Sequence, residues 1–294
     1  MHGTLRGLAA CTCAAASRFR IRFLVLLAAL PLLACTNFSP DARRASADAM
    51  ALAHGWRPLR LATREFVLAA YAPSPARPGE TLAVYIEGDG LAWLSPSRPS
   101  DDPTPLRPLA LELALRHDRG TAVYLARPCQ YVEAAERRGC EPAFWTDRRF
   151  ADAVVAATSE AIDALMQRFQ ARRLVLVGYS GGGAVAALVA ARRHDVVRLV
   201  TVAGNLAPRQ WAQQHELAPL TGSLDPGDAW RALQDIPQYH LVGAEDSNVT
   251  PELAAAFAAR FPAGKRPPVE VVEGATHTCC WADKWPALLP QAVP

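Results

Sequence analysis

Short runs of apolar and β-branched residues alternate with longer segments of helical periodicity over most of the chain. The pattern predicts an edge strand at residues 59–70 and buried strands at residues 81–87, 121–125, 173–177, 196–202, 238–242 and 269–272. It predicts helices at residues 106–117, 149–170, 184–193, 228–233 and 251–260. Apolar strands separated by helices indicate a mostly parallel central sheet with helices on both faces. We therefore expect one α/β domain over residues 57–294, with residues 204–236 as a small cap excursion.

The first 34 residues have the pattern of an export signal. They carry four arginines and no acidic residue, and three of these arginines come shortly before an uninterrupted apolar run at residues 23–30. This run is too short to span a bilayer, which needs about 20 apolar residues, and it fits the core of a signal peptide. Residues 35–56, rich in Ala, Ser, Asp and Arg, are predicted to form a tether between this segment and the folded body.

The export signal ends in the sequence Leu-Leu-Ala-Cys at residues 32–35, which resembles the lipobox of bacterial lipoproteins. The resemblance implies that residues 1–34 are removed and that Cys35 then carries a lipid that anchors the protein to the cell envelope. Thr36 stands where lipoproteins retained at the inner membrane often have Asp, which favours the outer membrane and its periplasmic side. The alternative is an ordinary secretory leader in which this cysteine occurs by chance.

Composition and charge exclude several classes of partner. The 294 residues are 51% hydrophobic and 20% charged, as in ordinary globular proteins, and can bury a core without a structural metal. Subtracting the four leader arginines from the formal net charge of +3 leaves −1, so we expect no basic surface for nucleic acid. The cysteines lack the spacing of a zinc site, and no metal or cofactor is expected. The oligomeric state does not follow from these quantities.

A Gly-x-Ser-x-Gly sequence at residues 178–182 lies between a predicted strand and a predicted helix. This is the context of a nucleophile elbow, in which the chain reverses so sharply that glycines are needed on both sides of the serine. The turn would hold the Ser180 hydroxyl at the N-terminus of the helix, where free N–H groups stabilise a developing oxyanion. A glycine-rich turn with an incidental serine is the alternative interpretation.

A serine hydroxyl needs a base, and two further residues have suitable positions. Asp246 and His277 each follow a predicted strand, so both lie at carboxyl ends of strands, the edge where open α/β sheets bind ligands. The order serine, acid, histidine resembles that of the α/β-hydrolases, and the resemblance covers about residues 57–290. It implies that Ser180 is the nucleophile, His277 the base and Asp246 the acid, although Glu245 is adjacent to Asp246.

The resemblance also implies an oxyanion hole. Its first donor would be the N–H of Gly181, and its second would come from the turn after the strand at residues 81–87. Many α/β-hydrolases have His-Gly-x-Gly in this turn, whereas this chain has Glu-Gly-Asp-Gly at residues 87–90, which makes the N–H of Asp89 the second donor. An acidic side chain beside an oxyanion is unfavourable unless it turns away.

The activity implied is hydrolysis of a small-molecule carboxylic ester or related acyl compound through an acyl-enzyme. A thioesterase, amidase or acyltransferase would use the same triad. A non-catalytic binding protein with the same fold is an alternative of a different class. Six tryptophans near predicted loops could line an apolar pocket or simply pack those loops: Trp93, Trp145, Trp211, Trp230, Trp281 and Trp285.

An exported protein can form disulfides, because it reaches an oxidising compartment. We expect a bond between Cys129 and Cys140, which lie in one irregular stretch and close the smaller loop. This pairing leaves Cys279 and Cys280 as free thiols or as a bond between neighbours. The alternative pairing joins one of the first two cysteines to one of the last two, and so ties this loop to the loop that bears His277.

Overall fold

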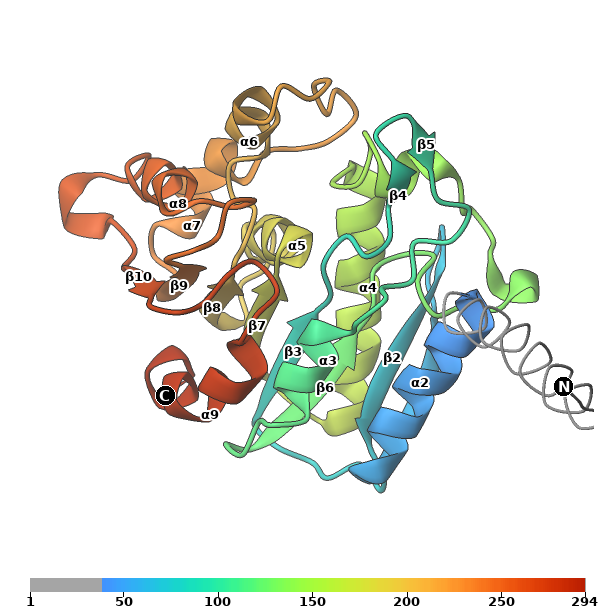
Figure 1. The fold of residues 1–294 in the computed structure, drawn as a ribbon. Helices are drawn as coiled ribbons and strands as arrows, with labels where there is room; N and C mark the ends of the chain where they lie inside the picture. The colour runs from blue at the N-terminus through green and yellow to red at the C-terminus, as the bar shows by residue number, and fades with distance from the viewer. Residues whose placement is uncertain (1–38, 294) are drawn as a thin grey trace, which may run out of the picture.

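The computed structural model describes residues 39–293, and an eight-stranded sheet is its centre (Figure 1). The strand order is β1-β2-β6-β3-β7-β8-β9-β10; β1 and β2 are antiparallel to their neighbours, and the other six strands are mutually parallel. The predicted mostly parallel sheet is therefore confirmed. The strands are β1 (Trp56–Ala62), β2 (Val67–Pro73), β3 (Thr81–Ile86), β6 (Thr121–Leu125), β7 (Arg173–Tyr179), β8 (Val196–Val202), β9 (Gln238–Gly243) and β10 (Val269–Val272).

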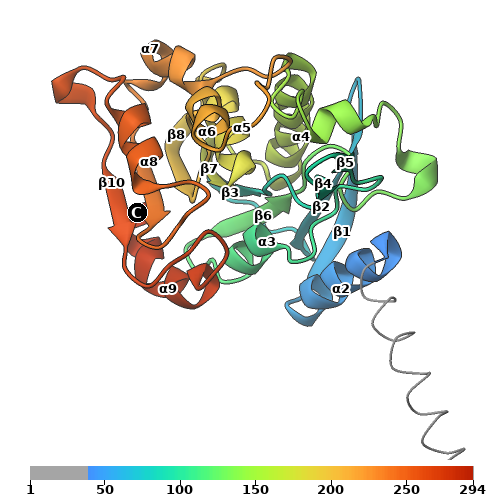
Figure 2. The ribbon, with the colours of Figure 1, turned by 45° about the horizontal axis from the view of Figure 1, so that its top comes forward.

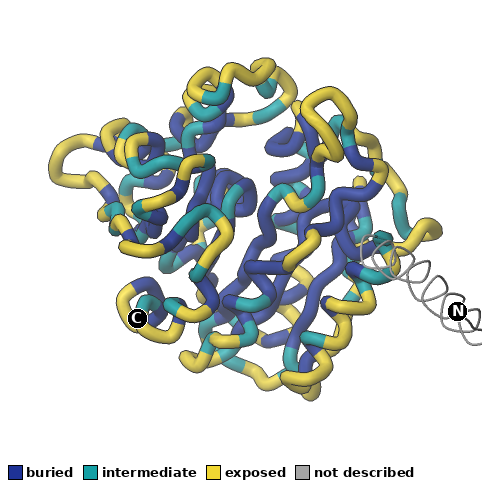
Figure 3. Tube along the Cα trace, in the orientation of Figure 1, coloured by how far each residue is buried: buried dark blue, intermediate teal, exposed yellow. Residues whose placement is uncertain are grey.

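Helices cover both faces of the sheet, with a separate apolar core on each side (Figures 1 and 2). The core on one side includes side chains of α4 (Asp152–Phe169), α5 (Gly181–Ala190) and α8 (Pro251–Ala258). The core on the other side includes side chains of α2 (Pro40–Ala53), α3 (Leu109–Ala114) and α9 (Trp281–Ala292). The central strands are mostly buried between these layers (Figure 3), whereas most residues of the edge strands β1 and β10 are exposed or half-buried. No helix within residues 39–293 is long and apolar enough to cross a membrane.

Two predictions at the N-terminal side are wrong. Residues 59–70 do not form one edge strand, because the chain turns back at Thr63, whose backbone and hydroxyl both bond to Phe66, and continues as β2. Most of the predicted tether at 35–56 is helix α2, which begins at an N-cap Ser39 and buries Ala47 and Ala51 against the sheet. The alanines of this segment favour a helix, and Ser39 followed by Pro40 is a helix start signal, so the tether prediction overlooked a local pattern. Cys35 and the export signal lie outside the described residues.

The C-terminal helix α9 was not predicted. Pro286 and Pro290 stand inside it, and proline normally ends a helix because it removes a backbone donor. Burial explains the helix: Trp281 and Trp285 are fully buried in the core shared with α2 and α3. The excursion at residues 204–236 contains α6 (Pro208–Gln214), a short 3₁₀ turn and α7 (Trp230–Leu233). Tertiary packing thus decided the helical state of segments whose local sequence is unfavourable.

Candidate active site

Ser180 lies at the sharp turn between β7 and α5. Its φ of +51° and ψ of −124° are unusual for a residue with a side chain, and place it in the strained backbone conformation of a nucleophile elbow. A Cβ on Gly178 would lie 2.4 Å from the Gly182 carbonyl oxygen, and a Cβ on Gly182 would lie 2.4 Å from the Ile86 carbonyl oxygen. Both glycines are therefore required by close backbone approach, as the sequence pattern suggested.

The structure brings the three residues of the predicted relay together. Ser180 Oγ lies 2.9 Å from His277 Nε2, and His277 Nδ1 lies 2.9 Å from Asp246 Oδ2. The other oxygen of Asp246 accepts hydrogen bonds of 2.8 Å from the backbone N–H groups of Asn248 and Val249. Asp246 is buried, so its carboxylate is held in one orientation toward the imidazole. Glu245, its neighbour, takes no part in this relay.

Two aromatic side chains hold the loop that carries His277. The Tyr179 hydroxyl donates to the His277 carbonyl oxygen at 3.1 Å, and the Trp281 indole N–H donates to the carbonyl oxygens of Thr276 and His277 at 2.9 and 3.2 Å. Trp281 begins α9, the helix that sequence patterns did not predict. Neither contact has a sequence signature, because each depends on how distant segments pack.

The turn after β3 lies directly against the elbow. A Cβ on Gly88 would lie 3.2 Å from the Ser180 Cβ, and a Cβ on Gly181 would lie 2.1 Å from Asp89 Oδ1. Gly181 is the first residue of α5, where backbone N–H groups have no acceptor within the helix. In the described part of the chain, no hydrogen bond uses the Asp89 N–H. The two N–H groups of the predicted oxyanion hole therefore belong to adjacent segments.

The side chain of Asp89 is held by two buried arginines. Arg127 Nη1 lies 3.1 Å from Asp89 Oδ1, and Arg149 Nη1 lies 2.9 Å from Asp89 Oδ2. Burial by itself raises the pKa of Asp89, but Arg149 and Arg127 outweigh it and bring that pKa below its ordinary value. The carboxylate beside the oxyanion hole is thus compensated by two positive charges. Sequence reasoning identified the acid and missed both arginines.

The buried Glu87 side chain holds the same turn through backbone hydrogen bonds. Its side chain is 1% exposed, and Oε1 accepts hydrogen bonds from the Gly88 N–H at 3.0 Å and the Ala110 N–H at 3.4 Å. Burial raises the pKa of Glu87 to about 7. The carboxyl group therefore fixes the peptide that leads to Asp89, and it keeps its proton up to about pH 7.

Comparisons with known proteins concern the fold of this chain. A scan against protein-family models and a search of curated proteins found no match. An esterase from Pyrococcus furiosus superposes with a TM-score of 0.56 at 13% identity, over 81% of this chain and 89% of its own. Est1E from Butyrivibrio proteoclasticus superposes with a TM-score of 0.54 at 14% identity, over 80% of this chain and 98% of its own. A lidless α/β serine hydrolase from Xanthomonas campestris superposes with a TM-score of 0.52 at 13% identity, over 81% of this chain and 95% of its own.

This chain has the α/β-hydrolase fold. The sheet order and the position of the elbow after β7 agree with the fold class expected from the sequence. At these identities the likeness concerns the fold alone. Within residues 39–293, no group of three or more His, Cys, Asp or Glu side chains is arranged to hold a metal ion.

A cleft of about 870 Å³ opens above Ser180 and His277 at the carboxyl edge of this α/β-hydrolase sheet. Its lining is mainly apolar and comes from the turn after β3, the small hairpin of β4 (Trp93–Ser95) and β5 (Arg98–Pro99), and the segment around α6. Trp93 and Trp211 line it, whereas Trp281 and Trp285 are core residues. Only part of the predicted tryptophan cluster therefore faces the site.

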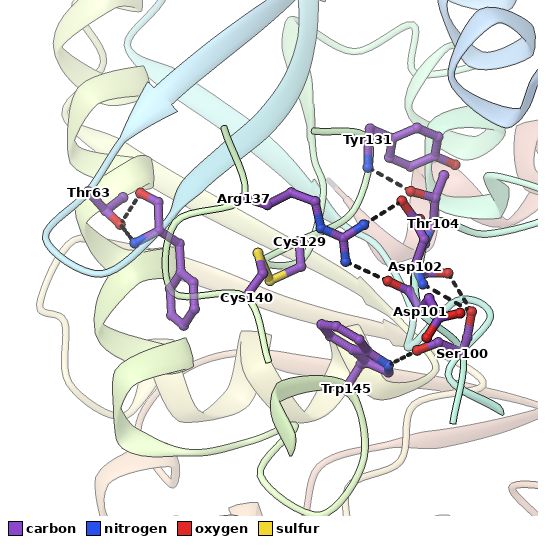
Figure 4. The surroundings of a disulfide bond; sticks show 11 residues. Thr63, Ser100, Asp101, Asp102, Thr104, Cys129, Tyr131, Arg137, Cys140 and Trp145 are labelled. Atoms are coloured by element: carbon purple, nitrogen blue, oxygen red, sulfur yellow. Dashed lines mark hydrogen bonds and ion pairs between the residues drawn. A yellow bond between two sulfur atoms is a disulfide. The ribbon is translucent and has the colours of Figure 1, made fainter. Parts of the chain in front are cut away.

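The four cysteines within residues 39–293 form two disulfide bonds. Cys129 is bonded to Cys140 with a Cα–Cα distance of 5.7 Å, and Cys279 is bonded to its neighbour Cys280. Figure 4 shows the first bond beside polar contacts that join its loop to residues 100–104. Arg137 Nη1 lies 3.0 Å from Asp102 Oδ2, and the Trp145 indole N–H donates to the Ser100 carbonyl oxygen at 2.9 Å.

Proposed function

We propose that this protein is a serine hydrolase that cleaves carboxylic esters through an acyl-enzyme. The observation that supports this function best is the continuous relay from Ser180 through His277 to the buried Asp246, with both contacts at 2.9 Å. A nucleophile, a base and a group that orients the base are what acyl transfer needs. The esterases among the structural neighbours are consistent with the same chemistry.

In this mechanism, Ser180 Oγ attacks the ester carbonyl while His277 Nε2 takes the hydroxyl proton. Asp246 stabilises the imidazolium that forms, and the N–H groups of Gly181 and Asp89 donate to the oxyanion. His277 then returns the proton to the departing alcohol, which leaves the acyl group on Ser180. Water enters, His277 takes one of its protons, and the acyl-enzyme is hydrolysed to the acid and free serine.

A fluorophosphonate probe tests whether Ser180 is an activated nucleophile. We expect covalent labelling of the wild-type chain and release of p-nitrophenol from short p-nitrophenyl esters, with both lost in Ser180→Ala. Ser95→Ala is the matched control, because Ser95 lines the same cleft outside the relay and should keep labelling and turnover. A Ser180→Ala protein with normal turnover would falsify the mechanism. An intact wild-type protein without labelling or turnover would instead support the non-catalytic alternative.

The losses of activity caused by His277→Ala and Ser180→Ala should not be additive. Members of a triad act as a unit, so the double variant should lose little more activity than either single variant. Thioesters and amides, tested beside esters of the same acyl group, distinguish ester hydrolysis from the thioesterase and amidase alternatives that share the triad. An added alcohol acceptor tests the acyltransferase alternative.

We also propose that the mature protein is exported and anchored to the cell envelope through a lipid on Cys35. The support is the sequence at residues 32–35, which follows an apolar segment preceded by arginines. Cys35→Ser should yield an uncleaved or soluble product, whereas the wild type should fractionate with membranes and incorporate labelled fatty acid. A Cys35→Ser protein that is processed normally and stays in the membrane fraction would contradict the anchor.

A further inference from the structure

Exposed apolar side chains gather at the mouth of the catalytic cleft. Seven large apolar side chains are exposed in the described part of the chain, and four of them line this one cleft. They are Trp93, Leu94, Leu106 and Leu217, with exposed fractions of 40%, 49%, 54% and 48%. Single exposed leucines are common on proteins, but a contiguous apolar set around one site marks a contact with an apolar partner. We call these four residues the apolar rim.

The apolar rim is formed by three separate segments without charged residues. Residues 91–96 and 105–106 supply one side of the cleft mouth, and residues 217–220 supply another part of its lining. Figure 1 shows the β4–β5 hairpin and the segment after α6 at the same end of the molecule, and Figure 3 shows both as largely exposed. Ser180 is less exposed than the rim and lies deeper in the cleft.

We propose that the apolar rim docks the protein on a lipid surface, from which an acyl ester enters the cleft. This inference rests on the proposed ester hydrolysis and names its substrate class, an ester with a long acyl chain that resides in a lipid assembly. A single acyl chain inside the cleft would leave the outward halves of the rim side chains in water, whereas a lipid surface would cover them. A tryptophan at the edge of such a patch suits the boundary between lipid and water.

Charged residues of both signs stand beside the apolar rim. Arg98 is exposed in the β4–β5 hairpin, and residues 91–100 contain no acidic residue. Arg107 is exposed next to Leu106, although it also pairs with Glu112 at 2.5 Å. Glu216 is exposed next to Leu217, and the exposed Asp147 lines the same cleft, so these charges do not favour one sign and the docking rests on the apolar side chains.

The start of α2 contacts the segment that leads to Leu106. Arg43, in the first turn of α2, donates to the Thr104 carbonyl oxygen, and the next two residues, 105 and 106, line the cleft mouth. Cys35 precedes the N-cap Ser39 by four residues, a length of chain that reaches at most about 14 Å. A lipid on Cys35 would therefore hold the rim segment near the membrane that the rim contacts.

The test uses the mature chain, residues 35–294, carrying Cys35→Ser, so that no lipid anchor replaces the rim. Two esters of the same leaving group are compared: soluble p-nitrophenyl butyrate, and p-nitrophenyl palmitate in vesicles of phosphatidylcholine with phosphatidylglycerol. The rim variants are Leu94→Ser, Leu217→Ser and their combination. Leu52→Ser and Val271→Ser are the matched controls, because both residues are similarly exposed and lie outside the cleft.

Each single rim variant should lose about tenfold in rate on the vesicle ester and the combination about a hundredfold, because half-burying a leucine in lipid contributes about one power of ten in affinity. Rates on the soluble ester should fall by a clearly smaller factor than rates on the vesicle ester, because a soluble substrate needs no docking, and the controls should match the wild type on both substrates. Rim variants that hydrolyse the vesicle ester as fast as the wild type, or that lose equal activity on the two esters, would overturn the docking.

A second readout does not depend on turnover and separates docking from catalysis. In the Ser180→Ala background, vesicles of brominated phosphatidylcholine should quench part of the tryptophan fluorescence, and Trp93→Phe should remove that quenched part. Trp230→Phe, a change on α7 away from the cleft lining, should leave the quenching in place. Quenching in this background, together with no ester hydrolysis by the protein that keeps Ser180, would support the docking and refute the proposed function. Absence of quenching would refute the docking.

Discussion

Replacing Glu87 by Gln should stabilise the protein at alkaline pH and leave it nearly unchanged at acidic pH. Glu87 is 1% exposed, and burial raises the pKa of its carboxyl from 4.5 to about 7. Between these two pH values the unfolded chain loses the Glu87 proton while the folded chain keeps it, so the free energy of unfolding falls as the pH rises. Above about pH 7 both states are ionised and the loss is complete.

The magnitude follows from the same two pKa values. At 1.36 kcal/mol for each pH unit, an interval from 4.5 to about 7 corresponds to about 3 kcal/mol of lost stability. Glutamine is isosteric, and its carbonyl oxygen can accept the hydrogen bonds that Oε1 now accepts from Gly88 and Ala110. Glu87→Gln should therefore unfold at a higher urea concentration than the wild type at pH 8, and at a similar one at pH 4.5.

Urea unfolding monitored by circular dichroism at pH 4.5, 6 and 8 measures this difference. Glu80→Gln is the matched control, because the Glu80 side chain is 73% exposed and its replacement should change stability little at any of these pH values. Other carboxyl groups titrate alike in the wild type and the variant, so the difference between the two curves isolates Glu87. A Glu87→Gln protein that is less stable than the wild type at pH 8, or shifted equally at every pH, would refute the reasoning.

Two further predictions concern the surroundings of the site. Arg149→Met should lower kcat on a soluble ester by about ten- to a hundredfold, because Asp89 beside the oxyanion hole loses one compensating charge; Arg149→Lys should recover part of the loss, and an unchanged kcat in Arg149→Met would contradict the role. Replacing Cys129 and Cys140 together by Ala should cost about 2–3 kcal/mol of stability in urea unfolding, and a non-reducing peptide map that joins Cys140 to Cys280 would contradict this pairing.

The elbow and the sheet could be predicted from the sequence because their causes are local. Continuous apolar runs specify buried parallel strands, and β6, β8 and β10 have the predicted bounds. The glycines at 178 and 182 are needed by backbone contacts within a few ångströms of the turn itself and of the neighbouring strand. The positions of Asp246 and His277 followed from the rule that side chains after parallel strands meet at one edge.

The sequence concealed the features whose stabilisation comes from distant partners. Helix α9 contains two prolines that give a contrary local signal, and it forms because its apolar face completes the core that it shares with α2 and α3. The charge state around Asp89 depended on Arg127 and Arg149, which lie 38 and 60 residues away along the chain. The sequence alone therefore determined the fold class and the candidates for nucleophile, base and acid. Only the tertiary structure decided which charges compensate Asp89 and which apolar side chains stay exposed at the cleft, because both depend on contacts between segments that no local pattern encodes.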